Sequence, residues 1–271
     1  MPGADPVAAE AVRGFAAAHP GLRLAPVVAV IPALNEEASI AAVLDAIPAE
    51  WCGLAVDTIV VDDGSADATG AVAAAHGAHV ARHASNRGQG AAFATAYRLA
   101  RDHGARFIVT LDADGQWDPA DVPAVLAPVV AGEADLVLGS RVLGRAETSD
   151  NVRAAGVRVF SGLVRLLTGV RISDTSSGLR AMVAELTARV TLDQPQYQSS
   201  ELLLGAIAHG YRVTERPVTM HARTAGQSAK GTNLVYGLSY AQVIVRTWWR
   251  ERRAAARAPR AQPIPAERLD G

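Results

Sequence analysis

The feature that most constrains the fold of this chain is an apolar run that ends in two carboxylates. In FIVTLDADGQ, residues 107–116, a stretch of strand character leads into Asp112 and Asp114, which are one residue apart. Because alternate strand residues face the same side, both side chains can point the same way where the strand ends. Hard oxygens at this spacing suit a divalent cation that also binds phosphates. A D-x-D alone is weak evidence, since about one occurs by chance in a chain of this size, but its place after a buried strand gives it weight.

Strand-like and helix-like segments alternate along most of the chain, which is typical of an α/β fold with a mostly parallel central sheet and helices on both faces. The expected strands lie at about 27–31, 58–61, 79–82, 107–111, 135–138 and 212–220, and the expected longer helices at about 122–129, 151–167, 201–208 and 234–250. In sheets of this kind, ligands bind beyond the carboxyl ends of the strands. Residues 32–36, Asp62-Asp63 and residues 112–116 follow three such ends, so together they could hold a base, a ribose and a metal-bound diphosphate.

Several other functions are excluded by what the sequence lacks. The first strand is followed by PALNE rather than G-x-G-x-x-G, and there is no Walker loop, which argues against a Rossmann dinucleotide site and against an ATPase. A net charge of −1 gives no electrostatic support for nucleic-acid binding. The single Cys52 excludes an internal disulfide and a cysteine-rich metal site. The histidines are scattered without ligand spacing, so we expect them to have surface or packing roles.

Six motifs occur in an order that resembles the family-2 glycosyltransferases with the GT-A fold. They are VIPALNEE (30–37), VVDDGSADAT (60–69), NRGQGAA (86–92), LDADGQWDP (111–119), GSR (139–141) and DTSSGLR (174–180). The most similar branch is that of the dolichol-phosphate mannosyltransferases and bacterial polyprenyl-phosphate glycosyltransferases. The likeness covers about residues 27–230. It implies an inverting, metal-dependent enzyme that moves a hexose from a UDP- or GDP-sugar to a polyprenyl phosphate.

The resemblance also implies roles for individual residues on the donor side. The residues that would contact the nucleotide sugar are Pro32, Ala33, Leu34, Asn35, Glu36, Asp62, Asp63, Gly88, Gly90, Asp112 and Ala113. A carboxylate of the Asp62-Asp63 pair would accept from the base. Mg²⁺ or Mn²⁺ would be surrounded by Asp112, Asp114 and Gln116, with Asp114 also counted as catalytic. A loop carrying Arg223, Ser228 and Lys230 would close over the diphosphate and exclude water.

Plainer interpretations of the same residues stay open. Asp63-Gly64-Ser65 could simply cap a helix, residues 88–90 could form an ordinary turn, and residues 112–116 an acidic one. Residues 223–230 could be a basic surface loop. The sequence has Gln89 and Trp117 where many relatives have Lys and His, and it has Glu215-Arg216-Pro217 in place of the usual acidic-aliphatic-proline triplet. The sugar and the base of the donor are therefore left undefined.

The chemistry of the acceptor decides which residues act on it. A hydroxyl acceptor needs a general base near the anomeric carbon, whereas a phosphate is already an anion and needs only cations to place it. The resemblance makes Arg141, Arg153 and Arg180 the candidates for that placement, and Ser176 and Ser177 would add hydroxyl donors; a solvated surface arginine is the alternative for each cation. Glu201 lies where relatives that use hydroxyl acceptors often carry their catalytic carboxylate, but here it stands in SSEL.

The C-terminal segment predicts contact with a membrane surface. Residues 234–253 combine aromatic and apolar residues with a cluster of arginines, a mixture that suits the boundary between water and lipid. A helix that packs in the core or against another subunit is the alternative. No run reaches the roughly 18 apolar residues of a membrane span, and the N-terminus has no signal peptide. We therefore expect a cytoplasmic protein that is peripheral at the membrane or bound to a membrane protein partner.

The expected layout has four parts: a flexible tail or a loosely attached helix at 1–25, a GT-A catalytic domain at 26–233, the amphipathic helix at 234–253 and a disordered tail at 254–271. The leading hypothesis for function is the polyprenyl-phosphate transferase. The alternatives are a family-2 transferase that uses a hydroxyl acceptor with Glu201 as base, and a non-catalytic nucleotide-sugar-binding partner subunit. The sequence leaves self-association open.

Overall fold

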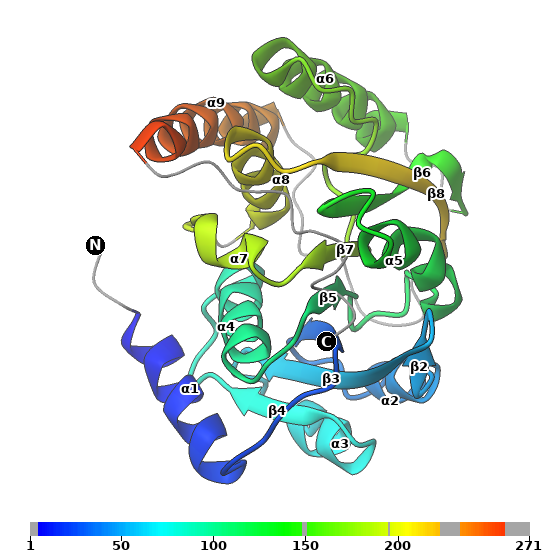
Figure 1. The fold of residues 1–271 in the computed structure, drawn as a ribbon, viewed down its shortest axis with the longest axis vertical. Helices are drawn as coiled ribbons and strands as arrows, with labels where there is room; N and C mark the ends of the chain where they lie inside the picture. Colours follow the sequence, from blue (N-terminus) through cyan, green and yellow to red (C-terminus); the bar gives the residue numbers. More distant parts are fainter. Residues whose placement is uncertain (1–4, 148–150, 195, 223–233, 258–271) are drawn as a thin grey trace.

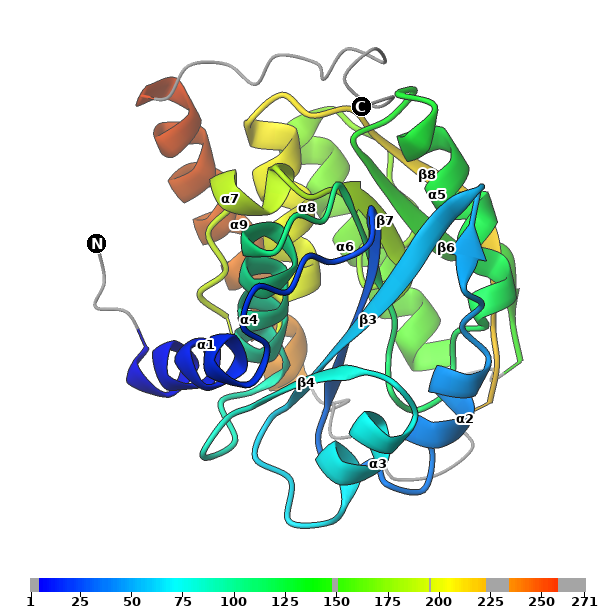
Figure 2. The ribbon, with the colours of Figure 1, turned by 60° about the horizontal axis from the view of Figure 1, so that its bottom comes forward.

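A computed structural model describes residues 5–147, 151–194, 196–222 and 234–257, and these residues form a mixed, mostly parallel sheet with helices on both faces (Figures 1 and 2). The strands are β1 (Val27–Ala33), β2 (Glu50–Trp51), β3 (Leu54–Asp62), β4 (His79–Arg82), β5 (Phe107–Thr110), β6 (Leu136–Ala146), β7 (Arg180–Val183) and β8 (Val213–Met220). Their order in the sheet is β2-β3-β1-β5-β7-β6-β8, and β4 pairs with β3. This arrangement confirms the predicted α/β class.

The central strands are apolar on both faces because helices cover both sides of the sheet. All seven residues of β1 are buried, as expected for a parallel strand between two helix layers. The helices are α1 (Pro6–Ala18), α2 (Ile40–Asp45), α3 (Thr69–Ala75), α4 (Gln89–Asp102), α5 (Val122–Val130), α6 (Asn151–Thr168), α7 (Leu186–Arg189), α8 (Gln198–Ala208) and α9 (Leu234–Arg257), with a 3₁₀ turn at Pro119–Asp121. Figure 2 shows α1 and α4 on one side of β3, and α2 and α3 on the other.

The direction of β7 determines which loop lies at the carboxyl edge of the sheet. The strands β1, β3, β4 and β5 are parallel, so their carboxyl ends lie at one edge. β7 runs antiparallel to both β5 and β6, and Arg180 pairs with Thr110 on one side and Leu138 on the other. The start of β7 therefore lies at the edge where β5 ends, and the loop that precedes β7 arrives there too.

Three differences from the sequence predictions have physical reasons. The expected N-terminal tail contains α1, whose Ala11 and Phe15 are buried and which packs on β4 and α4. β1 continues through Pro32, because its pairing with β5 ends at Val30 and the missing N–H of proline faces the side where β5 has already ended. At the other end, α9 continues to Arg257, so part of the expected disordered tail is helical. Residues 258–271 lie outside the described residues.

Candidate functional site at the carboxyl edge of the sheet

The loops after β1 and β3 are bonded to each other and form one unit. Asn35 has a left-handed backbone with φ of 55°, a conformation that asparagine tolerates better than most residues. Its N–H donates to Ser65 Oγ (3.0 Å), and its Oδ1 accepts from the N–H of Ala66 (2.8 Å). The N–H of Glu36 donates to Thr69 Oγ1 (2.8 Å). Of the residues predicted to contact a nucleotide, Pro32 and Ala33 lie buried inside β1, while residues 34–36 project beyond it.

The carboxylates of Asp62 and Asp63 are buried and engaged with neighbouring loops. Asp62 accepts from the N–H of Ser65 (2.8 Å) and from Nη1 of Arg82 (2.9 Å). Asp63 Oδ1 lies 2.6 Å from His83 Nδ1, and its Oδ2 accepts from the N–H of Gly88 (2.8 Å). These bonds shape the loops after β3 and β4, and they do not cap a helix, because the N-cap residues of α3 and α4 are Ala68 and Gly88 and neither N-cap has a side-chain bond. The exposed cation Arg82 stands beside them.

Asp63 also fixes the glycine turn that begins α4. Gly88 has a φ of 88°, in the left-handed region that favours glycine, and its N–H is held by the Asp63 carboxylate. Gly90 is buried in the first turn of α4. The first helical residue, Gln89, donates from Nε2 to Asp112 Oδ1 (3.1 Å). The turn therefore connects the Asp63 side of the edge to the D-x-D.

The two aspartates of the D-x-D have different surroundings. Asp112 accepts from Gln89 and, through Oδ2, from Trp117 Nε1 (3.0 Å). A Cβ on Gly178 would overlap that same Oδ2, so the loop before β7 presses directly on Asp112. Asp114 is buried at 5% exposure, and its Oδ1 accepts from the N–H of Gln116 (3.0 Å). Ala113 between them is buried.

A metal at this edge would depend on oxygen ligands from the D-x-D and from the ligand itself. Within the described ranges, no three His, Cys, Asp or Glu side chains are grouped so that they could hold an ion. Carboxylate and amide oxygens are nevertheless the donors that Mg²⁺ and Mn²⁺ prefer, and Asp112, Asp114 and Gln116 supply them. The N–H of His221 donates to the Gln116 carbonyl (2.9 Å), so the end of β8 also lies against this loop.

Arg141 is held in place by a buried carboxylate. Its Nε lies 3.0 Å from Asp174 Oδ2, and its Nη2 donates to Ser176 Oγ (2.6 Å). Its Nη1 lies against the sulfur of Met220 (3.1 Å), and a thioether is a weak acceptor. Glu215 in turn accepts from the N–H groups of residues 173 and 174 (2.7 and 2.9 Å). The GSR and DTSSG motifs therefore form one cationic corner of the edge.

Arg180 and Ser177 do not face solvent. Arg180 is 1% exposed and donates to the Ser177 carbonyl (2.8 Å), Gln198 Oε1 (3.2 Å) and Ser199 Oγ (2.6 Å). Its guanidinium lies 5.8 Å from the centre of the Phe93 ring. The Ser177 hydroxyl donates to the Leu179 carbonyl. In this structure both residues join the loop before β7 to the start of α8, a position different from the surface acceptor contacts that we predicted.

Glu201 is fully buried in a network that joins α8 to α9. Its Oε2 accepts from the N–H groups of Asp193 (2.9 Å) and Gln194 (2.8 Å), and its Oε1 pairs with Arg250 Nη2 (3.0 Å). Burial raises the pKa of Glu201, and the bonds to Gln194 and Arg250 act in the opposite direction. These contacts give the carboxylate a structural task.

Some predicted residues cannot be placed. Arg223, Ser228 and Lys230 lie outside the described residues. Arg153 lies in the first turns of α6, and its side chain is outside the description. No helix in the described part of the chain is both long and apolar enough to cross a bilayer.

Several residues at the edge were missed by the sequence analysis. Asp174 and Glu215 stand inside motifs that we quoted, but nothing in their spacing shows that they clamp Arg141 and its loop. His83 was taken as a packing residue, and it is one: it is fully buried between Asp63 and Thr95. Arg82 ends a short strand and carries no motif signal.

The sequence of this chain is similar to those of known proteins. Residues 28–189 match Glycosyl transferase family 2. The chain is 28% identical over 224 residues to the undecaprenyl-phosphate mannosyltransferase of Micrococcus luteus, covering 77% of this chain and 89% of the relative. It is 33% identical over 192 residues to the polyprenol monophosphomannose synthase of Mycolicibacterium smegmatis, covering 66% and 72%.

A solved structure shows the same fold. Glucosyl-3-phosphoglycerate synthase from Mycobacterium tuberculosis, in complex with Mn²⁺, UDP-glucose and phosphoglyceric acid, has a TM-score of 0.61 and 23% identity, covering 93% of this chain and 85% of that one. This likeness confirms the predicted GT-A arrangement of the sheet and helices.

Proposed function

The chain belongs to Glycosyl transferase family 2, and we propose that it transfers a hexose from a nucleoside-diphosphate sugar to the phosphate of a polyprenyl phosphate. One of its relatives is named as an undecaprenyl-phosphate mannosyltransferase, and another as a polyprenol monophosphomannose synthase. The acceptor phosphate oxygen attacks the anomeric carbon while the bond from that carbon to the diphosphate oxygen breaks. A single displacement of this kind inverts the configuration and releases the nucleoside diphosphate.

The observation that carries the proposal is the contrast between Glu201 and Arg141. A hydroxyl acceptor would need a base, but Glu201 is buried and bonded to two backbone N–H groups and to Arg250. Arg141 is aligned by Asp174 and turns its Nη1 toward a weak acceptor, the Met220 sulfur. Such an N–H can exchange the sulfur for a phosphate oxygen at little cost, because hydrogen bonds between charged groups are about twice as strong as neutral ones.

Each part of the edge has a task in this reaction. Residues 34–36, Arg82 and the turn at Gly88 would contact the nucleotide. Asp114, with Asp112 and Gln116, would hold a divalent cation, which would neutralise charge on the departing diphosphate. Arg141, Ser176 and Arg153 would place the acceptor phosphate. Arg180 and Ser177 keep the loop before β7 in position.

A two-phase assay tests the proposal. The protein is incubated with Mg²⁺ or Mn²⁺, labelled UDP- or GDP-sugars and a short polyprenyl phosphate, and lipid is then extracted into organic solvent. We expect label in the organic phase, and its loss in EDTA and in Asp114→Ala. Product only with hydroxyl acceptors, dependent on Glu201, would replace the proposal with the hydroxyl-using enzyme. Nucleotide-sugar binding without turnover would replace it with a non-catalytic binding subunit.

A further inference from the structure

Most of the large apolar side chains that are exposed in the described residues come from three segments of the chain. Seven large hydrophobic residues are exposed in the described residues, and six of them lie at the end of β6, on α6 or on α9. They are Val142, Leu143, Val159, Leu166, Val245 and Trp249, with Leu166 81% and Val159 66% exposed. Single exposed apolar residues are ordinary, but a concentration of them marks a surface that contacts something.

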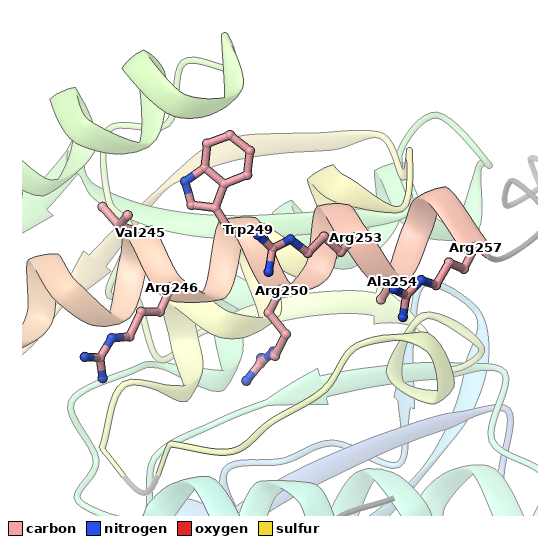
Figure 3. A pocket seen from close by; sticks show the side chains of 7 residues that line it. All are labelled: Val245, Arg246, Trp249, Arg250, Arg253, Ala254 and Arg257. Atoms are coloured by element: carbon pink, nitrogen blue, oxygen red, sulfur yellow. The ribbon is translucent and has the colours of Figure 1, made fainter.

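The two helices do not need these residues for their own packing. α6 already buries Val157 and Val164, and α9 buries Ile244 and Trp248. The helices contact each other, and the rings of Phe160 and Tyr240 lie 4.2 Å apart. In Figure 3, Trp249 extends toward one edge of a hollow along α9, and Arg246 and Arg250 extend toward the other. The hollow is lined by Val245, Arg246, Trp249, Arg250, Arg253, Ala254 and Arg257. The apolar residues on the outer faces are therefore additional to the core.

The charge on the same two helices has one sign. α6 contains no Asp or Glu, and the one acidic residue of α9, Glu251, is fully buried. Six arginines on these helices are exposed, although the whole chain has a net charge of −1: Arg158, Arg165, Arg246, Arg252, Arg253 and Arg257. Arg252 also lies 5.9 Å from the ring centres of Trp248 and Trp249. Cationic and apolar side chains are thus interleaved.

We propose that this α6–α9 surface, made of the exposed residues of both helices, docks on a bilayer that contains anionic lipid. Anionic headgroups match the arginines, and the apolar side chains and Trp249 suit the boundary between headgroups and acyl chains. A nucleic acid or an acidic protein would match the arginines but would leave Val159 and Leu166 unexplained. Val142 and Leu143 follow Arg141 directly in the chain, so the proposed phosphate contact adjoins exposed aliphatic residues.

This inference rests on the proposed function, because a polyprenyl phosphate lies in a membrane. Vesicle binding tests it without any measurement of turnover. The full chain is mixed with vesicles of phosphatidylcholine alone, or with 30% phosphatidylglycerol, and bound protein is measured by flotation. We expect binding to the anionic vesicles and its loss in high salt. The double variant R246E/R253E should bind them at least about 20-fold more weakly, from ~1 kcal/mol for each basic residue near an anionic surface.

Two further variants separate charge from apolar insertion. R13E/R23E makes the same change in net charge at exposed positions away from the surface, and it should bind vesicles like the unaltered chain. L166S/W249S should bind anionic vesicles more weakly while keeping their salt dependence. Circular dichroism verifies that all variants are folded.

The outcomes distinguish the two proposals. No binding to anionic vesicles, an equal loss in R13E/R23E, or unchanged binding in L166S/W249S with equal affinity for duplex DNA would overturn the docking surface. Activity is assayed separately on short polyprenyl phosphate in detergent. Vesicle binding without activity would reject the proposed function and support the docking surface. Activity without vesicle binding would support the proposed function and reject the docking surface.

Discussion

The two halves of the carboxyl edge use charge in opposite ways. On the donor half, after β1, β3, β4 and β5, the carboxylates of Asp62 and Asp63 are buried, that of Asp112 is half-buried, and all three are bonded to neighbouring residues. On the acceptor half, formed by β6 and the loop before β7, the carboxylate of Asp174 is buried and holds a cation, Arg141, which lies within β6. Both substrates of the proposed reaction are anions. The comparison suggests that the donor half neutralises its anion with a bound cation, and that the acceptor half does so with a guanidinium.

The strongest way to break this comparison is to remove Asp114. We expect Asp114→Ala to lower turnover about 10³-fold, because the loss of charge neutralisation at the departing diphosphate is a matter of several kcal/mol. Its free energy of unfolding should change little. The measurement is kcat over a titration of Mn²⁺, with Glu133→Ala as an exposed acidic control. Full activity of Asp114→Ala at saturating metal would show that the donor half does not work this way.

Glu201 tests whether the acceptor half contains a base. Glu201→Ala removes the partner of Arg250 and of two backbone N–H groups, so we expect it to lower the free energy of unfolding by about 3 kcal/mol, measured by urea titration. Glu201→Gln should keep kcat within about twofold, a change well under 1 kcal/mol. A large loss of kcat in a stable Glu201→Gln protein would instead identify Glu201 as a base.

Substitution of Arg141 tests whether the acceptor half acts on the acceptor alone. Arg141→Lys keeps the charge but loses the planar pairing with Asp174. We expect KM for the polyprenyl phosphate to rise about tenfold, which corresponds to ~1.4 kcal/mol, with the Kd for the nucleotide sugar unchanged. Titration calorimetry for the donor and steady-state kinetics for the acceptor separate the two. Equal losses on both sides would mean that the corner is not specific to the acceptor.

The smallest expected effect is the pH dependence of stability that comes from His79. Burial lowers the pKa of His79 on β4, and His19 and His103 nearby act in the same direction, while Asp57 opposes them. The unfolded chain therefore binds a proton at a higher pH than the folded one, and stability falls as the pH drops through and below the ordinary histidine range of about 6.5. Urea unfolding at pH 8 and pH 5.5 measures this difference. His79→Gln should reduce it, and an identical pH dependence would contradict the assignment.

The regular parts of the fold could be predicted from hydrophobic periodicity. The bounds 79–82 for β4 match the structure, and the helix predicted at 122–129 ends one residue later as α5. The antiparallel β7 was missed because it directly follows the polar DTSSG motif and begins with Arg180, a charged residue that we interpreted as a surface contact. The segment that forms α1 was predicted as a tail or a loosely attached helix, because it offers few large apolar residues, and the structure buries Ala11 and Phe15.

The candidate site was predictable as a set of motifs, whereas the bonding of its residues was not. Sequence order placed residues 32–36, Asp62-Asp63 and residues 112–116 at one edge because parallel strands end together, and the resemblance added Arg141. It could not show that Arg180 and Glu201 are buried, since burial of a charged side chain depends on partners from distant segments, such as Gln198 for one and Arg250 for the other.

The loop before β7 can change in sequence independently of the strands that carry the D-x-D. The turn that precedes β7 is bonded to β6 through Asp174 and Arg141 and to β8 through Glu215, and neither of these strands carries the D-x-D. A different length or composition at residues 173–177 need not displace the strands that carry the D-x-D. Selection for new acceptors can thus act on one segment while recognition of the sugar nucleotide is inherited intact.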